Sequence, residues 1–459
     1  MGWDKWLYQT TAALVLSSAI FPASARSDTL RDALALAYET NPTLLAARAQ
    51  QRAADEEFPI QASQGRPNIS ITANYIDFVK VSPNSFTAPD RGFFSGVDMT
   101  VPIYSGGAVR NGVKAANMRI QATRAELRGV ESTVFSQVTA AYMDLLRAEA
   151  LASLANNQVE VLRVNLEATN DRFEIGELTR TDIAQSQSRL AIAQSDLRNA
   201  EANLIGAREN YVQLVGRAPD NLQTPPPLAG IPETVSEAVS LALTQNPDLM
   251  AARERAQAAG YDSEVAGAGR LPRFGAFANL EYTNYFNSLG GPISSSFAQE
   301  ETTGNVGVQL TIPLFQGGRP AAQQRQAYAR ETAALENVIA AERSVIAQTR
   351  AAYSSWLAAN AVIISSEAAV GAAELSLEGV RAENSIGNRT ILDVLNAEQE
   401  LLSARAQLVS ARRNAYVAGF SILAATGKAE ARDLNLVPSG LLYDPTVNFE
   451  RVRGALFDW

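Results

Sequence analysis

The stretch that decides the fold reads VPIYSGG at residues 101–107, and it returns 211 positions later as IPLFQGG at residues 312–318. Each copy follows residues that alternate between apolar and polar, and each precedes a long alanine-rich stretch. Proline lacks an N–H and is tolerated where a strand ends, and paired glycines permit an abrupt change of direction. The phrase therefore predicts a junction between a strand and a helix, formed by Pro102, Gly106, Gly107, Pro313, Gly317 and Gly318.

The alternation before each junction predicts β-strands. In NISITANY, residues 68–75, every second residue is apolar or aromatic and the residues between them are small and polar. Such a tilted strand needs about ten residues to cross a bilayer, and aromatic residues gather near the strand ends as they do at membrane interfaces. Four strands are expected, at about 67–79, 92–103, 273–286 and 303–314.

Alternation alone does not distinguish a membrane barrel from a soluble antiparallel sheet that has one solvent-exposed face. The polar face is expected to be small and uncharged, and the loops at 80–92 and 287–303 are long and rich in Ser, Pro and Gly, which favours the barrel. Four strands are too few to close a barrel, and in hydrocarbon no backbone edge can stay unpaired. A membrane location therefore requires several chains to share one barrel, without deciding how many.

After each junction the sequence predicts a pair of long helices. Residues 106–172 contain no proline, and apolar residues recur there at alternating steps of three and four. The same pattern runs through the return segments, so helical hairpins are expected at about 106–216 and 317–427. Alanine occupies many of these recurring apolar positions, where the helices are expected to pack on one another. Alanine buries too little apolar area for a thick core, so the pattern predicts a single layer of helices and not a globular core. An ordinary two-stranded coiled-coil rod is the alternative.

The sequence of the first half of the chain recurs, in similar form, in the second half. The segment TLRDALALAYETNP, which begins at Thr29, matches TVSEAVSLALTQNP, which begins at Thr234, and further matches run through both hairpins. We expect a first repeat at 26–223, a Pro-rich linker at 224–233, a second repeat at 234–427, and a C-terminal equatorial or tail segment at 428–459. Residues 1–25 have the pattern of a secretory signal peptide, with a short apolar core and a small-residue cleavage site.

Composition excludes several classes of function. The formal net charge is −9, from 39 basic and 48 acidic residues, without the basic block that a nucleic-acid binder needs. Cysteine and histidine are both absent, which removes disulfides, thiol nucleophiles, zinc–thiolate sites and the commonest general base. An enzyme that acts through carboxylates or lysine stays open on composition, but we expect no enzyme, no cofactor and no metal site. Beyond the signal peptide, we also expect no stretch of the ~20 apolar residues that a membrane helix needs.

With its strand pairs, Gly-Gly junctions, hairpins and duplication, the mature chain resembles the outer-membrane efflux protein family of TolC-like channels. The doubled Asn-Pro helix, the doubled junction and the hairpin turns FEIGELTRTD (173–182) and NSIGNRTILDVLNAEQ (384–399) carry the resemblance. It implies a mainly α protein with membrane β, in which a homotrimer forms a 12-stranded β-barrel, four strands per chain, continuous with a 12-helix periplasmic α-barrel. It also implies a passive export duct in the outer membrane of a Gram-negative bacterium.

The resemblance further implies partners: outer-membrane lipid, a periplasmic adaptor (membrane fusion) protein, and an inner-membrane transporter of RND, MFS or ABC type. The adaptor would meet the hairpin turns at Ile175, Gly176, Leu178, Ile386 and Gly387. Drug efflux and type I protein secretion both stay open, and the sequence names no cargo. A periplasmic coiled-coil adaptor or scaffold is a weaker alternative because adaptors typically carry one hairpin. A trimeric surface adhesin would need a long passenger region.

A latch also follows from the resemblance. It implies that the second hairpin closes the periplasmic end and is held by polar links to the first. Arg389 matches the linking arginine of the family, and Thr181 and Asp182 match its partners. A guanidinium can hold a carboxylate through two hydrogen bonds, so these residues are candidates for a gate latch. The family's nearby tyrosine is replaced by Asn384, which puts a second link in doubt.

The aperture residues implied by the resemblance are Asp393 and Asn396. Three copies of Asp393 around an axis would favour cations and could bind a blocking multivalent cation. Asn396 stands where the family carries a second aspartate, so the block should be weaker. The alternative is that these residues are exposed helix-end charges that contribute little.

Overall fold

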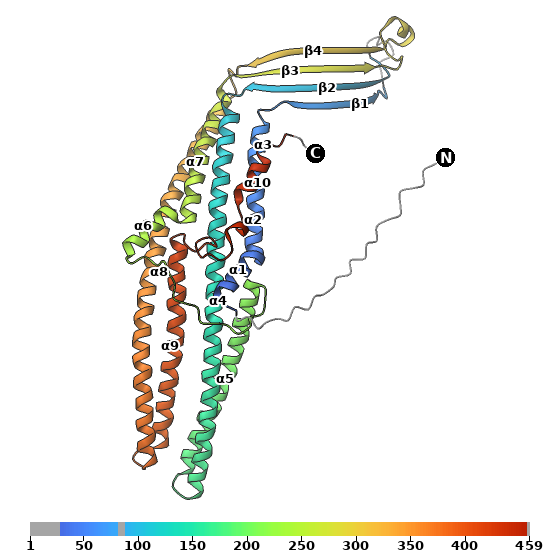
Figure 1. The fold of residues 1–459 in the computed structure, drawn as a ribbon. Helices are drawn as coiled ribbons and strands as arrows, with labels where there is room; N and C mark the ends of the chain where they lie inside the picture. The colour runs from blue at the N-terminus through green and yellow to red at the C-terminus, as the bar shows by residue number, and fades with distance from the viewer. Residues whose placement is uncertain (1–27, 81–87, 457–459) are drawn as a thin grey trace, which may run out of the picture.

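The computed structural model of the chain describes residues 28–80 and 88–456. Its long helices run side by side as a rod, and a β-sheet at one end of the rod leans away to one side (Figure 1). The elements follow the same order in each half: short helices, two strands, then two long helices. The expected signal peptide lies outside the described residues.

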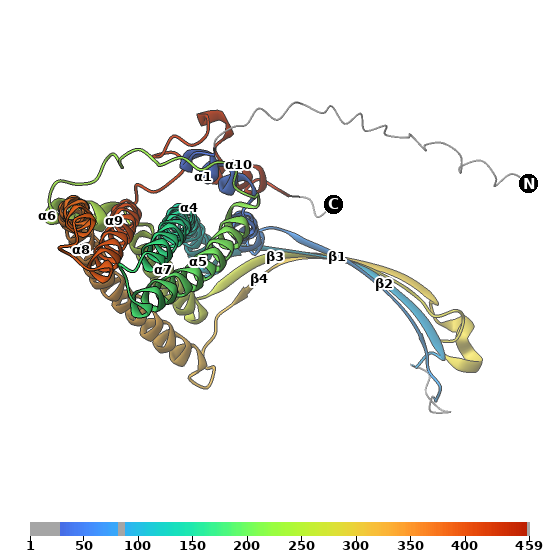
Figure 2. The same cartoon turned by 90° about the horizontal axis from the view of Figure 1, so that it is seen from below.

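The sheet contains β1 (Asn68–Asp77), β2 (Arg91–Tyr104), β3 (Arg273–Asn284) and β4 (Glu300–Thr311), paired antiparallel in that order. β2 and β3 come from different halves of the chain and form the centre of the sheet. Figure 2 shows the sheet as a curved ribbon beside the helices. The order leaves the outer edges of β1 and β4 without a ladder partner among the described residues.

The strand register decides which side chains share a face of the sheet. Asp98 lies opposite Ser70 on one side and Asn279 on the other, and Asn279 lies opposite Asn305, so polar residues line one face. The expectation of an uncharged polar face is wrong, because the same register also brings carboxylates onto it. These carboxylates are Asp98, Glu281 and Glu301.

The opposite face of the sheet is apolar and uncovered. Its residues include Ile69, Ile71, Val306, Val308 and Leu310, which are 60 to 83 % exposed. A contiguous apolar surface of this kind marks a face that meets lipid or another protein.

Two helical hairpins form the rod. The first joins α4 (Ala108–Glu174) to α5 (Arg180–Val215), and the second joins α8 (Arg319–Ser385) to α9 (Ile391–Ala425). α4 and α8 have 67 residues each, so each is about 100 Å long. Several predicted seam positions of α4 are buried, namely Ala141, Leu145, Ala148, Ala152 and Leu162.

Shorter helices lie along the half of the rod next to the sheet (Figure 1). In the first half of the chain, α1 (Leu30–Thr40), α2 (Pro42–Asp55) and α3 (Glu57–Ser63) pack on α4. In the second half, α6 (Val235–Gln245) and α7 (Pro247–Gly267) pack on α8. The remaining elements are the short 3₁₀ helices η1 (Ala268–Arg270), η2 (Gly291–Ser296) and η3 (Ser439–Leu441), and helix α10 (Pro445–Val452).

The doubled Asn-Pro pair has the same geometry in both halves. The side-chain oxygens of Asn41 and Asn246 each accept a hydrogen bond of 3.0 Å from the backbone N–H two residues on, at the start of α2 and α7. Their amide groups donate to the last turns of the return helices, to the Leu214 carbonyl at 2.9 Å and the Ala425 carbonyl at 3.0 Å. Each asparagine thus caps a short helix and ties it to the end of a hairpin.

The two strand-to-helix junctions share their glycines and differ in their prolines. Gly107 and Gly318 have φ of +86° and +78° directly before α4 and α8, a conformation that suits glycine. Pro102 lies inside β2 beside an irregularity in the register, whereas Pro313 lies beyond the end of β4. β4 therefore ends earlier than the alternation predicts.

The largest cluster of buried apolar residues in the described part of the chain lies at mid-rod and draws on α1, α4, α5 and α9. Phe135, Tyr142, Tyr211 and Phe420 are each at most 2 % exposed there. Burial of such large rings stabilises the rod, because each ring removes a large apolar area from water.

The segment after α9 runs back along the N-terminal helices. The Tyr443 N–H donates to the Tyr38 hydroxyl at 2.8 Å, and the Asn448 amide donates to the fully buried carboxylate of Asp55 at 2.9 Å. These bonds attach the C-terminal segment to α1 and α2.

The expectation about membrane helices needs a correction. Among the described residues, α8 is long and apolar enough to cross a bilayer by length and composition, with a mean hydropathy of 1.3 over its most apolar segment. That segment is apolar on average because alanine, valine and isoleucine surround its polar residues. Only 17 % of it is buried, and α8 packs along α7 and α9 within the rod. We therefore interpret α8 as a rod helix with an uncovered face.

Candidate functional site

The candidate site is the end of the rod far from the sheet, where the two hairpins turn. The first turn follows α4 through Ile175 and Gly176, and the second follows α8 through Ile386 and Gly387. Both glycines have φ near +80°, which lets each helix stop and reverse. The two isoleucines are about 70 % exposed, whereas Leu178 is half-buried and lines a cavity between the hairpins.

The two predicted gate carboxylates occupy equivalent places in the two turns. Asp182 accepts hydrogen bonds of 2.8 Å from both the backbone N–H and the hydroxyl of Thr179. Asp393 accepts from the hydroxyl and N–H of Thr390 at 2.8 and 3.0 Å. These capping boxes stabilise the negative charge and lower the pKa of both carboxyl groups.

Arg389 bonds within its own hairpin. Its Nε donates to the Glu383 carboxylate at 2.7 Å, and this pairing raises the pKa of the guanidinium. Glu383 lies on the last turn of α8, directly across the hairpin turn from Arg389, so its carboxylate is within reach of the Arg389 guanidinium. Among the described residues no hydrogen bond joins Arg389 to Asp182 or to the exposed Thr181. The latch role of these residues stays a prediction.

Other polar residues connect the two hairpins. Arg172 on α4 donates to Asn384 on α8 at 3.4 Å, and Arg189 on α5 donates to Asn396 on α9 at 2.8 Å. Asn396, predicted to line an aperture, thus accepts a bond from the other hairpin. The sequence reasoning missed both arginines because their partners are more than 200 residues away in the chain.

A buried carboxylate provides a further connection. Glu398 on α9 is 3 % exposed, and it accepts hydrogen bonds from Asn165 on α4 at 2.9 and 3.0 Å. Arg381 on α8 donates to the same carboxylate at 2.9 Å. We call Asn165, Arg381 and Glu398 the Glu398 bridge. A glutamate within the apolar seam of α9 was the one sequence signal that could have indicated it.

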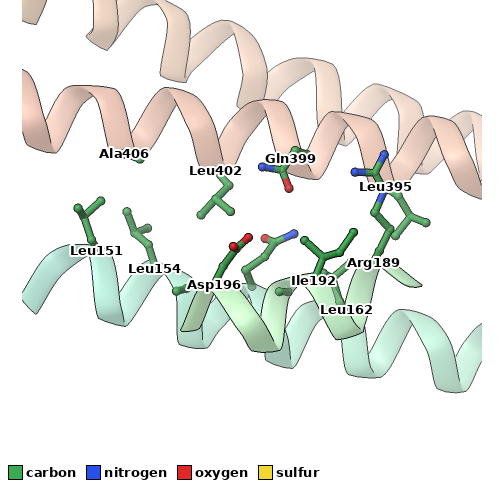
Figure 3. A pocket seen from close by; sticks show the side chains of 13 residues that line it. Leu151, Leu154, Leu162, Arg189, Ile192, Asp196, Leu395, Gln399, Leu402 and Ala406 are labelled. Atoms are coloured by element: carbon green, nitrogen blue, oxygen red, sulfur yellow. The ribbon is translucent and has the colours of Figure 1, made fainter. Parts of the chain in front are cut away.

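A cavity of about 160 Å³ lies between the hairpins, beside the bridge on the side facing the sheet. In Figure 3, Leu151 and Leu154 face Leu402 and Ala406 of α9 across this gap. Arg189 reaches from α5 toward α9 at one end of the cavity (Figure 3). The hairpins therefore leave a gap here, and at one end of it the hydrogen bond from Arg189 to Asn396 joins them.

Comparison with solved structures defines the class of fold. The outer membrane protein VceC of Vibrio cholerae superposes with a TM-score of 0.74, over 87 % of this chain and 96 % of that chain, at 24 % identity. The CmeC outer membrane channel of Campylobacter jejuni superposes with a TM-score of 0.77, over 93 % and 89 % of the two chains, at 17 % identity. The fold is that of an outer-membrane channel.

Sequence comparison places the chain in a family. The profile of the family described as outer membrane efflux protein matches residues 33–217 and 238–428. The chain is 31 % identical to the outer membrane efflux protein BepC of Brucella suis, over 97 % of this chain and 95 % of BepC. It is 26 % identical to the outer membrane protein TolC of Vibrio cholerae, over 95 % and 98 % of the two chains. The alkaline protease secretion protein AprF of Pseudomonas aeruginosa is 28 % identical, over 70 % and 66 %.

The chain belongs to the outer membrane efflux protein family. It is an outer-membrane channel with a periplasmic extension and serves as the exit duct of an export system. The family is one of channels and not of enzymes.

Proposed function

We propose that three copies of this chain form one continuous duct across the outer membrane and into the periplasm. The observation that carries the proposal is the sheet: its apolar face is exposed, and the outer edges of β1 and β4 have no ladder partner among the described residues. In hydrocarbon each unpaired backbone group costs several kcal/mol, so such edges must pair with other copies. Three sheets joined edge to edge give a barrel of twelve strands, whose polar faces line the lumen.

The rod supports the same assembly. α8 exposes a row of large apolar residues along its length, namely Leu335, Ile339, Leu357, Ile364 and Leu375. A single copy leaves this row in water, whereas a neighbouring hairpin would bury it. Three copies then place twelve long helices around a periplasmic tunnel, which continues the barrel.

We further propose that cargo passes through this duct passively. The sequence contains no nucleotide-binding motif, so the energy comes from an inner-membrane transporter of RND, MFS or ABC type, joined through a periplasmic adaptor. Exposed Ile175 and Ile386 at the periplasmic turns are the surface that we assign to the adaptor.

At the same end we assign gating to the predicted residues. Asp393 and Asn396 stay candidates for the aperture, and Arg389 with Thr181 and Asp182 for a latch. If the latch holds the aperture closed, Arg389→Ala raises the conductance of the purified channel. Unchanged conductance in that variant removes Arg389 from the gate.

For cargo, efflux of small toxic compounds is our first proposal and protein secretion the second. The names of the relatives include both, since BepC is named for efflux and AprF for alkaline protease secretion. Deleting the protein and measuring both drug sensitivity and the set of secreted proteins separates them. Increased drug sensitivity with an unchanged secretome supports efflux.

The duct itself is tested with the purified protein. We expect a heat-sensitive oligomer on unboiled gels, a mass of three copies in detergent, and ion conduction in planar lipid bilayers. The apolar face of the sheet is tested separately. Val306→Lys places a charge on the side proposed to face lipid and should prevent membrane assembly. Asn305→Lys, one position away on the polar face, is the matched control and should assemble. A lone water-soluble particle without lipid affinity contradicts the proposal.

A further inference from the structure

We propose that a cavity where the rod meets the sheet is a binding site for a small organic anion that passes through the duct. The cavity has a volume of about 560 Å³ and lies between α4, α7, α8 and the start of β3. Figure 1 shows these helices reaching the sheet at this end of the rod. The location inside a duct rests on the proposed function, whereas the chemistry of the site depends only on the residues of one chain.

The charges on the cavity walls favour an anion. Three arginines and one aspartate line the cavity, which gives it a formal charge of +2 in a chain whose net charge is −9. The Arg119 guanidinium donates to the Asp262 carboxylate at 2.5 Å, so these two charges compensate each other. Arg273 and Arg330 are exposed, and among the described residues neither guanidinium has a hydrogen bond or an ion pair. Two guanidinium groups are therefore open to a ligand.

The register of β3 places Arg273 on the polar face of the sheet. Arg273 lies opposite Thr311 of β4, and an even number of residues separates it from Asn279 and Glu281 along β3. Side chains at such positions share one face of a strand. Arg273 therefore lies on the same face as the carboxylates, at the end of the strand next to the rod. Because Arg273 lines the cavity, the cavity opens on the side that faces the lumen in the proposed trimer.

α8 contributes a row of hydrogen-bond donors to the same site. Arg319, Gln323, Gln326 and Arg330 follow one another at steps of four, three and four residues, so they lie on one face of the helix, and all four are exposed. The last three of them line the cavity. A guanidinium can bind a carboxylate, sulfonate or phosphate through two hydrogen bonds, and the neighbouring amides can donate to the same group.

The two strand-to-helix junctions hold the walls of the cavity together. The Gln316 amide donates to the Gly269 carbonyl at 3.2 Å, which ties the segment before α8 to η1, just before β3. A Cβ at Gly269 would lie 3.7 Å from the Pro320 Cβ, so the two segments are in ordinary contact. The elements that carry Arg273 and Arg330 are thus attached to each other beside the cavity.

The remaining lining residues indicate the class of anion. Ala259, Val265, Ala266 and Ala327 give the cavity apolar walls beside its charged groups. A volume of about 560 Å³ lies within the range of about 300–1,000 Å³ that small-molecule sites occupy. The combination fits a small organic molecule in which an apolar body carries a carboxylate, a sulfonate or a phosphate.

Binding is tested with pyrenetetrasulfonate, a fluorescent aromatic anion, on the purified protein in detergent by fluorescence anisotropy. We expect wild type to bind this probe at low salt. Arg273→Gln/Arg330→Gln should weaken binding at least about ten-fold, because two charge-assisted contacts are lost. The control is Arg270→Gln/Arg325→Gln, which removes two exposed positive charges of η1 and α8 that do not line the cavity. It should change the affinity by less than about two-fold.

Two results overturn the site: no binding of the probe by wild type at low salt, or equal losses of affinity in the two double variants. The second result assigns binding to overall charge. If Arg273→Gln/Arg330→Gln does not form the heat-sensitive oligomer, Arg330→Gln alone replaces it, because this residue lies on the exposed surface of α8, outside the strands. That variant should bind about three-fold more weakly than Arg325→Gln. Equal affinities of these two single variants reject the site.

Ion conduction separates this proposal from the duct. If wild type conducts ions in planar bilayers, pyrenetetrasulfonate should interrupt the current, and Arg273→Gln/Arg330→Gln should shorten each interruption at least about ten-fold. Binding to wild type without interruption of its current rejects the location of the site in the lumen. If wild type conducts no ions, the duct itself is wrong, whereas the anisotropy measurement still decides whether the cavity binds the anion.

Discussion

The guanidinium of Arg413 on α9 donates two hydrogen bonds to the carboxylate of Asp144 on α4, at 3.0 and 2.8 Å. The side chains are 24 and 28 % exposed, and the residues come from different halves of the chain. The pair joins the second hairpin to the first at mid-rod, well away from the periplasmic turns. A bidentate arginine–carboxylate pair of this kind has a defined geometry, which an ion pair with a single contact lacks.

We expect Arg413→Ala to lower the free energy of unfolding by about 2 kcal/mol, because Asp144 loses both bonds in a partly buried setting. Chemical denaturation followed by circular dichroism measures the change. The control is Arg412→Ala, which removes a single 3.0 Å bond to Glu367 between side chains that are 60 and 51 % exposed. Its effect should be within about 0.5 kcal/mol. Equal losses in the two variants contradict the importance of the Asp144 pair.

The caps at the Asn-Pro pairs can be dissected by substitution. Asn246→Ala removes both the cap of α7 and the bond to the Ala425 carbonyl, and should cost about 1–2 kcal/mol of stability. Asn246→Asp keeps the capping oxygen and loses only the donor, so it should lie between the wild type and the alanine variant. Thermal unfolding of the detergent-solubilised protein gives the order. An aspartate variant as unstable as the alanine variant indicates that the bond to Ala425 matters more than the cap.

The two junctions offer a matched pair of glycines. Gly106 and Gly317 have similar φ, +66° and +58°, so alanine is strained by a similar amount at both. A Cβ at Gly106 would lie 2.8 Å from that of Leu271, whereas a Cβ at Gly317 meets nothing within 4 Å. We expect Gly106→Ala to reduce the yield of heat-sensitive oligomer much more than Gly317→Ala. Equal losses would assign the whole effect to backbone strain.

Stability should depend on pH through Glu131. Burial raises the pKa of this carboxyl from 4.5 to about 7, while its oxygen accepts a 2.5 Å bond from the Ala431 N–H. Charged groups around it are Glu430, Arg48 and Arg432, and the Tyr38 hydroxyl lies close by. The neutral form is favoured in the folded state, so its contribution is fully present below pH 4.5 and is lost as the pH rises through 7.

We therefore expect the wild type to lose stability between pH 5 and 8 by an amount on the order of 3 kcal/mol more than Glu131→Gln does. Denaturation midpoints of both proteins across this range measure the difference. The glutamine variant cannot ionise and keeps a carbonyl acceptor for the Ala431 N–H. Parallel pH profiles for the two proteins would show that Glu131 does not titrate in this range.

Ion selectivity tests the proposed aperture. In a trimer the half-exposed Asp393 carboxylates would lie around the axis, and the low pKa of each keeps it charged at neutral pH. Asp393→Asn should shift the reversal potential in a salt gradient toward lower cation preference. Asp171→Asn removes an exposed carboxylate near the turn of the first hairpin, outside the proposed latch, and is the control. A shift of equal size in both variants assigns the preference to overall charge and not to the aperture.

Local pattern predicted the elements of this protein well. The alternation in NISITANY lies within β1, and the heptad seams lie within α4, α5, α8 and α9. The Asn-Pro pairs start α2 and α7. Periodicity and capping act between neighbours in the chain, so one sequence is enough to read them. Strand ends were less well predicted, since β4 stops at Thr311 where no ladder bond follows.

The gate residues were predicted by resemblance, and only the fold reveals their present partners. Asp182 and Asp393 are the acidic residues of two capping boxes, and Arg389 bonds to Glu383. No pattern in the chain indicates that Asn165 would meet Glu398, since 233 residues separate them.

By itself the sequence showed the recurring motifs, the strand and helix periods, and the absence of cysteine and histidine, because each depends on residue type and spacing alone. Tertiary structure decided which charges meet. The register brought Asp98, Glu281 and Glu301 onto one face of the sheet, and the packing of the hairpins buried Glu398 beside Asn165. Such contacts depend on the relative position of distant segments, which only the packed backbone defines.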